Sequence, residues 1–134
     1  MGRVNEDSLV RSLVLHEDER GSLFEVLRAD QTDHDIKQIY FAISKPGASR
    51  GNHYHTRKIE WFCVTKGVGK LVLKHTVSLV EEEIILMGQN PTICEIRPNI
   101  SHSIINMGQD DMHLVVIANE VFDPNDADTF YEDL

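Results

Sequence analysis

The stretch between Gly47 and Gly67 concentrates residue types that can do chemistry. It reads GASRGNHYHTRKIEWFCVTKG and holds two histidines separated by one residue, His53 and His55, with Glu60 five residues after the second. If the chain around the histidines is extended, the two imidazoles project from the same side. A turn can then bring Glu60 back beside them on the next strand. Such a cluster can bind a divalent metal or carry protons near neutral pH.

His102 is a fourth candidate for this cluster. It lies in the segment IRPNISHSIINMG, at the end of a later strand. Polar residues on a solvated strand face explain an isolated H-x-H pair without any function. The spacing of the histidines alone therefore leaves both interpretations open.

Short apolar segments broken by turns surround this stretch. Their alternation and their β-branched and aromatic residues predict strands over 10–16, 22–28, 36–44, 59–65, 70–80, 82–87, 92–97 and 112–120. The turn EDERG predicts a hairpin between the first two. Seven or more short strands at regular spacing predict an antiparallel sandwich or barrel. Only 5–12 and 123–134 offer a helical turn or two.

Length and composition indicate one ordinary globular domain. The chain has 134 residues, 41% of them hydrophobic and 26% charged, enough for a single core. We expect one all-β domain over 1–134, with 1–16 as an N-terminal strand arm and 123–134 as a C-terminal tail. Cys63 and Cys94 lie in alternating apolar segments, so we expect buried free thiols.

The charge and the apolar pattern exclude some partners. With 22 acidic and 13 basic residues, the formal charge is −9, which disfavours a nucleic-acid surface. No apolar run approaches the roughly 18 residues of a membrane-spanning helix. The polar start MGRVNEDS lacks the apolar core of a secretory signal. We therefore expect a cytoplasmic protein with no membrane partner.

The spacing of the histidine stretch resembles the first signature of the cupin superfamily. That signature has a glycine, five residues, H-x-H, four residues, glutamate, six residues and a glycine, and every position agrees from Gly47 to Gly67. The resemblance implies a cupin fold, a double-stranded β-helix or jelly-roll barrel. It also implies a metal site at His53, His55, Glu60 and His102.

The second cupin signature is less complete. Gly88 can open it, and His102 followed by Asn106 keeps the expected interval. Arg97 and Asn99 stand where the signature has a proline and a glycine.

Further segments resemble particular groups within the cupin superfamily. DERGSLFEVLR, KPGASRGNHYH and ANEVFDPNDADTFYEDL resemble the C-terminal cupin domain of bacterial capsular-polysaccharide enzymes that modify nucleotide-linked ketosugars. DERG and RGNHYH are also similar to segments of the dTDP-4-dehydrorhamnose 3,5-epimerases and of sugar 3,4-ketoisomerases. The resemblance runs from about residue 17 to the C-terminus.

This resemblance implies an epimerase of bacterial surface polysaccharide biosynthesis, for O-antigen or capsule. The enzyme would invert carbon 3 of a nucleotide-linked 4-keto-6-deoxy sugar by proton abstraction through an enolate. A nucleotide-sugar 3,4-ketoisomerase shares the first proton step and is the alternative. A non-catalytic metal- or sugar-binding cupin is the second alternative.

The resemblance also assigns roles within the stretch. His53 holds the position of the catalytic histidine in the resembling epimerases, so it is expected to be the base. His55 matches the second histidine of the ketoisomerases and is expected to carry the second proton. A phenol is the other candidate for that proton, from Tyr40, Tyr54 or Tyr131. Strand alternation turns Tyr54 away from the histidines.

Glu60 stands where the rhamnose-pathway epimerases have a lysine, and this leaves two interpretations. A divalent metal such as zinc, held by the four cluster residues, could stabilise the enolate in place of the lysine. Alternatively, Glu60 orients and charges a histidine. A histidine bound to metal through its catalytic nitrogen cannot also be a free base, so we favour catalysis with no required cofactor.

The nucleotide diphosphate needs cationic partners. Arg20 matches the arginine of D-x-R-G, which in related epimerases reaches the nucleotide, often that of a neighbouring subunit. Arg50 and Arg57 flank the histidines and can meet phosphate oxygens. We expect these arginines and His102 to bind the substrate. The resemblance also implies a homodimer that exchanges N-terminal strands.

Overall fold

A computed structural model of the chain describes residues 10–134. Its strands are β1 (Val10–Ser12), β2 (His16–Asp18), β3 (Gly21–Leu23), β4 (Gln38–Ser44), β5 (Ser49–Tyr54), β6 (Glu60–Lys66), β7 (Val68–His75), β8 (Glu81–Met87), β9 (Thr92–Ile96), β10 (Ile100–Asn106), β11 (Met112–Ala118) and β12 (Phe130–Tyr131). The helical element among the described residues is η1 (Ala29–Gln31), a 3-10 turn.

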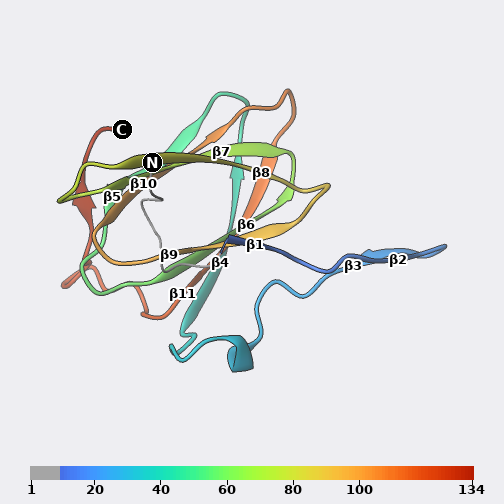
Figure 1. Cartoon of the computed structure of the whole chain (residues 1–134), viewed down its shortest axis with the longest axis horizontal. Coiled ribbons are helices and arrows are strands. Elements are labelled where there is room, and N and C mark those ends of the chain that lie inside the picture. Colours follow the sequence, from blue (N-terminus) through green and yellow to red (C-terminus); the bar gives the residue numbers. More distant parts are fainter. Residues whose placement is uncertain (1–9) are drawn as a thin grey trace.

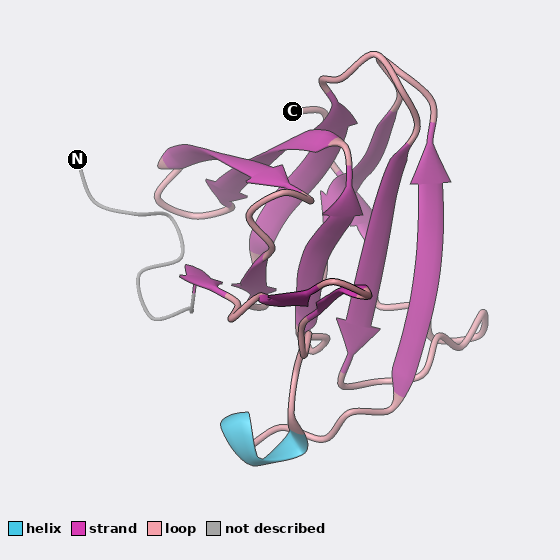
Figure 2. Cartoon of the chain, turned by 90° about the vertical axis from the view of Figure 1, so that its right-hand side faces the viewer, coloured by secondary structure: helices cyan, strands magenta, loops and turns pink. Residues whose placement is uncertain are grey.

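Ten of these strands form two five-stranded antiparallel sheets. One sheet has the order β1-β9-β6-β11-β4, and the other has the order β12-β5-β10-β7-β8. Figure 1 shows the strands wrapped around a common interior, and Figure 2 shows η1 at one end of them. This arrangement is the barrel of an all-β domain, so the predicted fold class is confirmed.

The interior between the sheets is filled by one apolar cluster. Alternate residues of the central strands supply it, as period-two patterning requires. Its buried members are Phe62, Val64, Leu71, Leu73, Leu86, Cys94, Ile96, Ile100, Ile104, Met112, Leu114 and Val116. The polar site described below lies at one end of this apolar interior, because the same face of β6 that carries Phe62 begins with Glu60.

Part of the outer face of the first sheet is covered as well, whereas its β4 side leaves Ile39, Phe41 and Ile43 exposed. Trp61, Ile93 and Ile117 are buried in the covered part. Leu13 and Ile36 lie over them, in segments outside the strands. Beyond this cover, the β2–β3 hairpin extends away from the body of the molecule (Figure 1).

Several predicted elements differ from the structure. The segment 10–16 divides into β1, which pairs with β9, and the start of β2. The predicted hairpin forms, but its second strand ends at Leu23, not at 28. The tail 123–134 has no helix; it forms β12 against β5. Of the helical turn expected over 5–12, residues 5–9 lie outside the described part of the chain, and the rest is in β1.

Two further expectations concern β10 and the cysteines. β10 is missing from the predicted strands, because serine, histidine and asparagine interrupt its apolar residues, and His102 lies inside it, not at the end of a strand. Cys63 and Cys94 are buried free thiols, as expected. Burial raises the pKa of the Cys63 thiol to about 11. Among residues 10–134, no helix is long and apolar enough to cross a membrane.

Candidate active site

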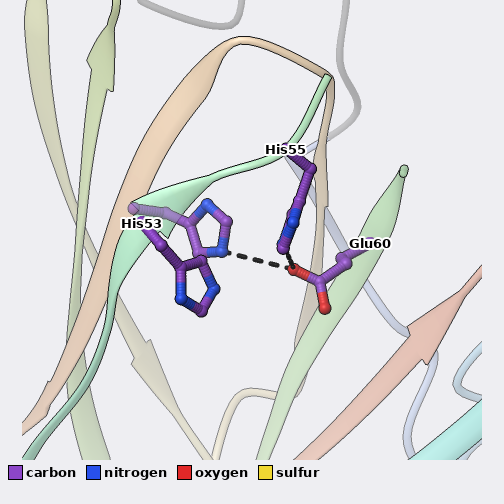
Figure 3. Close-up of side chains that lie close together, drawn as sticks. His53, His55 and Glu60 are labelled. Carbon is purple, nitrogen blue, oxygen red and sulfur yellow. Dashed lines mark hydrogen bonds and ion pairs between the residues drawn. The ribbon is translucent and has the colours of Figure 1, made fainter. Parts of the chain in front are cut away.

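Strands of both sheets bring the predicted cluster together. β5 carries His53 and leads into His55, β10 carries His102, and β6 begins with Glu60. The register of β5 and β10 places His53 directly opposite His102. The ring of His53 lies 4.8 Å from that of His102 and 4.9 Å from that of His55, centre to centre. Figure 3 shows His53 and His55 on one continuous stretch of chain, with Glu60 on a second strand facing them.

A β-bulge at Gly51 aims His53 into this space. The register between the two strands shifts between His102 and Ser103, where Gly51 adopts φ 95° and Asn52 φ 58°. A Cβ atom on Gly51 would lie 2.7 Å from the carbonyl oxygen of His102. Only glycine combines this left-handed backbone with so close an approach.

Glu60 is the buried centre of the cluster. Its Oε1 atom lies 2.9 Å from His55 Nε2 and 3.2 Å from His102 Nε2. Burial alone would raise the pKa of Glu60, but the contacts with His102 and His55 outweigh burial and hold it well below its usual range. Glu60 is therefore a carboxylate at neutral pH.

Backbone carbonyls fix the protonated nitrogen of two histidines. Nδ1 of His55 lies 2.7 Å from the carbonyl oxygen of Asp128, and Nδ1 of His102 lies 3.0 Å from that of Ile100. A carbonyl oxygen only accepts, so both Nδ1 atoms carry hydrogen and donate it. Both Nε2 atoms then face Glu60.

This arrangement calls for positive charge beside Glu60. His102 Nε2 is buried and, despite its distance of 3.2 Å from Glu60, does not have the direction of a hydrogen bond. A bare Nε2 lone pair facing a carboxylate is repelled. Either a second proton on the imidazoles or a metal cation removes that repulsion.

The four side chains fit a divalent cation. One donor atom from each of His53, His55, Glu60 and His102 can be chosen so that all lie within 4.8 Å of one another. Three imidazole nitrogens and one carboxylate oxygen suit zinc and similar metals. Nδ1 donation to backbone carbonyls, as seen for His55 and His102, is the usual second-sphere contact of metal-binding histidine.

His53 differs from its neighbours because its ring is half-buried at the edge of the cluster. Burial, followed by the nearness of His102 and His55, lowers the pKa of His53 to about 4. Its imidazole is therefore neutral at pH 7 and keeps a free lone pair. That state suits either a general base or a metal ligand.

The predicted arginines lie outside this cluster. Arg20 sits on the β2–β3 hairpin and pairs with Asp18, with its side chain 85% exposed. Arg50 donates to Ser44 Oγ at 2.8 Å. The guanidinium of Arg57 pairs with acidic residues, Glu120 and Asp126, at 2.7 and 3.2 Å. The structure thus brings together the histidines and Glu60 but not the arginines.

The three candidate tyrosines lie in different surroundings, and only one of them contacts a cluster histidine among the ring contacts described below. Tyr54 stacks on Phe130 at 5.3 Å, as strand alternation predicts. Tyr131 pairs with His53 across β12 and β5, and its ring lies edge-on to the imidazole at 5.9 Å. Tyr40 lies on β4, where burial and then the charge of Glu60 raise its phenol pKa.

Sequence reasoning missed Asp128 and Phe62. The ring of Phe62 packs edge-on against His102 at 5.6 Å. Asp128 lies 73 residues after His55, within the acidic tail. No spacing rule connects Asp128 with His55, so only the fold shows its role, whereas alternation along β6 already puts Phe62 on the same face as Glu60.

Comparisons with known proteins agree with this fold. Residues 16–130 match the model of the polysaccharide biosynthesis C-terminal domain family. UDP-2-acetamido-2,6-beta-L-arabino-hexul-4-ose reductase of Pseudomonas aeruginosa is 37% identical over 125 residues, which cover 93% of this chain and 32% of that protein. The chain therefore spans about a third of the length of this relative.

Solved structures show the same architecture. The capsular polysaccharide assembling protein CapF of Staphylococcus aureus is 34% identical, with a TM-score of 0.71 over 91% of this chain and 34% of that one. ChmJ, a 3'-monoepimerase of Streptomyces bikiniensis solved with dTDP-quinovose, is 20% identical, with a TM-score of 0.85 over 98% of this chain and 72% of that one. With its barrel and its match over residues 16–130, the chain belongs to the family of polysaccharide biosynthesis C-terminal domains.

Proposed function

We propose that the protein is an isomerase that inverts carbon 3 of a nucleotide-linked 4-keto-6-deoxy sugar for bacterial surface polysaccharide. The observation that carries this proposal is a neutral imidazole, His53, held beside a buried carboxylate–imidazole pair, Glu60 and His55. Membership in a polysaccharide biosynthesis family supports the substrate class.

The chemistry needs a base and a returning acid. A 4-keto group acidifies the hydrogen on carbon 3, so a ring nitrogen of His53 can take that proton while the bonding electrons form an enolate. Return of a proton to the opposite face of carbon 3 inverts it. His55 is the proposed second proton carrier; because its ring lies on the same side as His53, with Nε2 on Glu60 and Nδ1 on the Asp128 carbonyl, its proton would reach the opposite face of the sugar through water.

A divalent cation is the second form of this proposal. His53, His55, Glu60 and His102 would hold it, and a bound cation would supply a Lewis acid for the 4-keto oxygen. His53 cannot then offer the same nitrogen as a base. The residues fit either form, so the metal requirement needs a direct test.

The nucleotide would be bound by arginines, in a homodimer. The β2–β3 hairpin places Arg20 away from the cluster of its own chain, so a second copy offers the site that it would serve. Arg50 lies on β5, three residues before His53, and would bind phosphate in the proposed complex. Sedimentation velocity should show a dimer, and a monomer at assay concentrations would contradict this part of the proposal.

We also propose a cytoplasmic location, which the two free thiols suit.

A 3,4-ketoisomerase is the second candidate. The observation that favours it is that both histidines of the H-x-H pair face one space, with ring centres 4.9 Å apart. A ketoisomerase would return the proton to carbon 4 of the same enediolate and so move the carbonyl to carbon 3.

An NMR assay of products separates these functions. The protein is incubated with a panel of 4-keto-6-deoxy sugars linked to dTDP, UDP, CDP or GDP. Inversion at carbon 3 with the carbonyl still at carbon 4 supports the epimerase, whereas a carbonyl at carbon 3 supports the ketoisomerase. No change in any sugar, with binding retained, would point to a non-catalytic sugar-binding domain.

A further inference from the structure

The C-terminal segment reaches back into the site through one buried residue, Asp128. We propose that Asp128 is a positioning residue that fixes the orientation and the tautomer of His55. The contacts that carry this inference come from its carboxylate and from its backbone carbonyl. The effect on turnover rests on the proposed function, but the effect on His55 does not.

The carboxylate of Asp128 holds the turn that follows His55. Oδ1 accepts hydrogen bonds from the backbone N–H of Thr56, at 2.9 Å, and from its hydroxyl. Oδ2 accepts from the backbone N–H groups of Arg57, at 2.8 Å, and Lys58, at 3.0 Å. These four bonds tie down every residue of the turn between His55 and Ile59.

The same residue also contacts the imidazole directly. The carbonyl oxygen of Asp128 lies 2.7 Å from His55 Nδ1, which must donate to it. Asp128 has φ 49°, a left-handed backbone that aspartate and asparagine tolerate better than other non-glycine residues. This conformation lets the carboxylate accept hydrogen bonds from residues 56–58 while the carbonyl oxygen faces the ring of His55.

Burial and charge show that the contact is built for a carboxylate. Asp128 is 6% exposed. Burial alone would raise the pKa of its carboxyl, but the hydrogen bonds from Thr56 and the following N–H groups outweigh burial and lower it. An apolar side chain at this position would leave these N–H donors without their acceptor, including the buried N–H of Lys58.

The consequence for chemistry follows from the two nitrogens of His55. With its hydrogen held at Nδ1, the ring presents Nε2 to Glu60 at 2.9 Å. If the Asp128 carbonyl moved, the hydrogen could shift to Nε2 or the ring could rotate. Loss of the hydrogen from Nδ1 would leave the ring with one proton instead of two, and rotation would take Nε2 away from Glu60, so either change would impair His55 as a proton carrier or a ligand.

A second anchor of the same tail offers a matched control. Glu132 donates its backbone N–H to Asn52 at 2.8 Å, and its carboxylate accepts from Ser101 Oγ at 2.7 Å. It also pairs with Lys74 at 3.6 Å. Glu132→Gln therefore weakens the attachment of the tail without touching the turn at 56–58 or the ring of His55.

The test is long-range ¹H–¹⁵N NMR of the histidine side chains in the full chain, treated with chelator. Asp128→Asn keeps size and tolerates the left-handed backbone, but it offers one oxygen and an N–H₂ group to the N–H donors of the turn. We expect wild type and Glu132→Gln to show His55 with hydrogen on Nδ1, in slow exchange. We expect Asp128→Asn to lose that slow exchange and to populate the Nε2–H form.

Turnover gives a separate readout. Asp128→Asn should lower kcat on the order of tenfold or more, the usual effect of removing a partner that orients a functional histidine, with KM little changed. Failure of every substrate to react would sink the proposed function and leave the NMR result standing. A wild-type His55 with hydrogen only on Nε2 would overturn the inference whether or not the variant folds. A folded Asp128→Asn protein with an unchanged His55 signal would overturn it too.

Discussion

At the residue scale, the chemistry depends on what balances the charge of Glu60. Its Oε1 faces the Nε2 atoms of His55 and His102, while both Nδ1 atoms already donate to carbonyls. Either a second proton on the imidazoles or a bound metal ion can balance the negative charge of Glu60 in this geometry. The two solutions predict different behaviour under chelation.

Chelation combined with Glu60→Gln distinguishes them. If a metal is needed, exhaustive chelation stops turnover, added zinc restores it, and Glu60→Gln loses both metal and rate because an amide is a poorer ligand. If Glu60 only charges a histidine, chelation leaves the rate unchanged. Loss of its negative charge should then lower the pKa of the histidine seen in the pH–rate profile.

We expect the metal-free result, because proton abstraction needs a free nitrogen on His53. Metal content by mass spectrometry and turnover are measured on the same samples before and after chelation. Complete and reversible inhibition by the chelator would show that this expectation is wrong.

The phenol opposite His53 provides a second prediction at this scale. Tyr131 lies edge-on to His53 at 5.9 Å, whereas Tyr54 stacks on Phe130. If Tyr131 returns the proton in place of His55, Tyr131→Phe should lower kcat by about 100-fold, as loss of an acid does. The proposed role of His55 predicts instead a change of less than about tenfold, and Tyr54→Phe serves as the control.

The sequence predicted the cluster and missed its supports for a physical reason. His53, His55 and Glu60 lie within one short stretch, so alternation and one turn are enough to place them together. Asp128 reaches the site only because the tail folds back on β5. Arg20 lies on a hairpin that extends from the body of its own chain, so its predicted contact with a nucleotide, often that of a neighbouring subunit, stays a prediction.

At the scale of elements, the bulge in β5 determines where His53 points. Gly51 and Gly47 both have positive φ, at 95° and 80°. A Cβ on Gly51 would meet the His102 carbonyl oxygen at 2.7 Å, whereas a Cβ on Gly47 would meet nothing within 4 Å. A comparison of Gly47 with Gly51 therefore separates the cost of a left-handed backbone, which both share, from the cost of a steric clash, which only Gly51 has.

Alanine at each glycine tests this view. Gly47→Ala should lower the free energy of unfolding by about 1–2 kcal/mol, the cost of a left-handed backbone. Gly51→Ala should cost about 1–3 kcal/mol more, because the new methyl group collides with β10, and it should reduce turnover by moving His53. Urea unfolding measures the difference, and equal losses for the two variants would contradict the proposed role of the bulge.

The strand pattern was predictable where β-branched, aromatic and other apolar residues follow one another and was missed where polar residues interrupt them. β4, β6 and β11 are continuous apolar segments and fell within predicted strands. β10 escaped because the polar site residue His102 stands between the core residues Ile100 and Ile104 on its inward face, with a serine on either side. β12 has only two residues, Phe130 and Tyr131, and forms because β5 offers a free edge for pairing.

At the scale of the whole molecule, the site couples stability to pH. Burial, followed by the neighbouring histidines, lowers the pKa of His53 from its ordinary 6.5 to about 4. Between these values the unfolded chain binds a proton that the folded chain does not, so stability falls as pH falls from 6.5 to 4. The lowered pKa of Glu60 acts in the same direction below about pH 4.5.

Urea unfolding of chelator-treated protein at pH 7.5, 6 and 5 measures this loss. His53→Asn removes the titrating imidazole, so its stability should change less than that of wild type between pH 6 and 5. His113→Asn, on the outer face beside Phe41, is the control and should behave like wild type. Equal slopes for wild type and His53→Asn would contradict the assignment.

The central claim is that His53 removes the hydrogen on carbon 3 of a nucleotide-linked 4-keto-6-deoxy sugar. Incubation in deuterated water, followed by NMR of the recovered sugar, tests it most directly. The account predicts deuterium at carbon 3 with wild-type protein and a rate lower by about 100-fold or more with folded His53→Asn, as expected for loss of a general base. A substrate converted without deuterium at carbon 3, or a folded His53→Asn protein that incorporates it at the wild-type rate, would contradict the account.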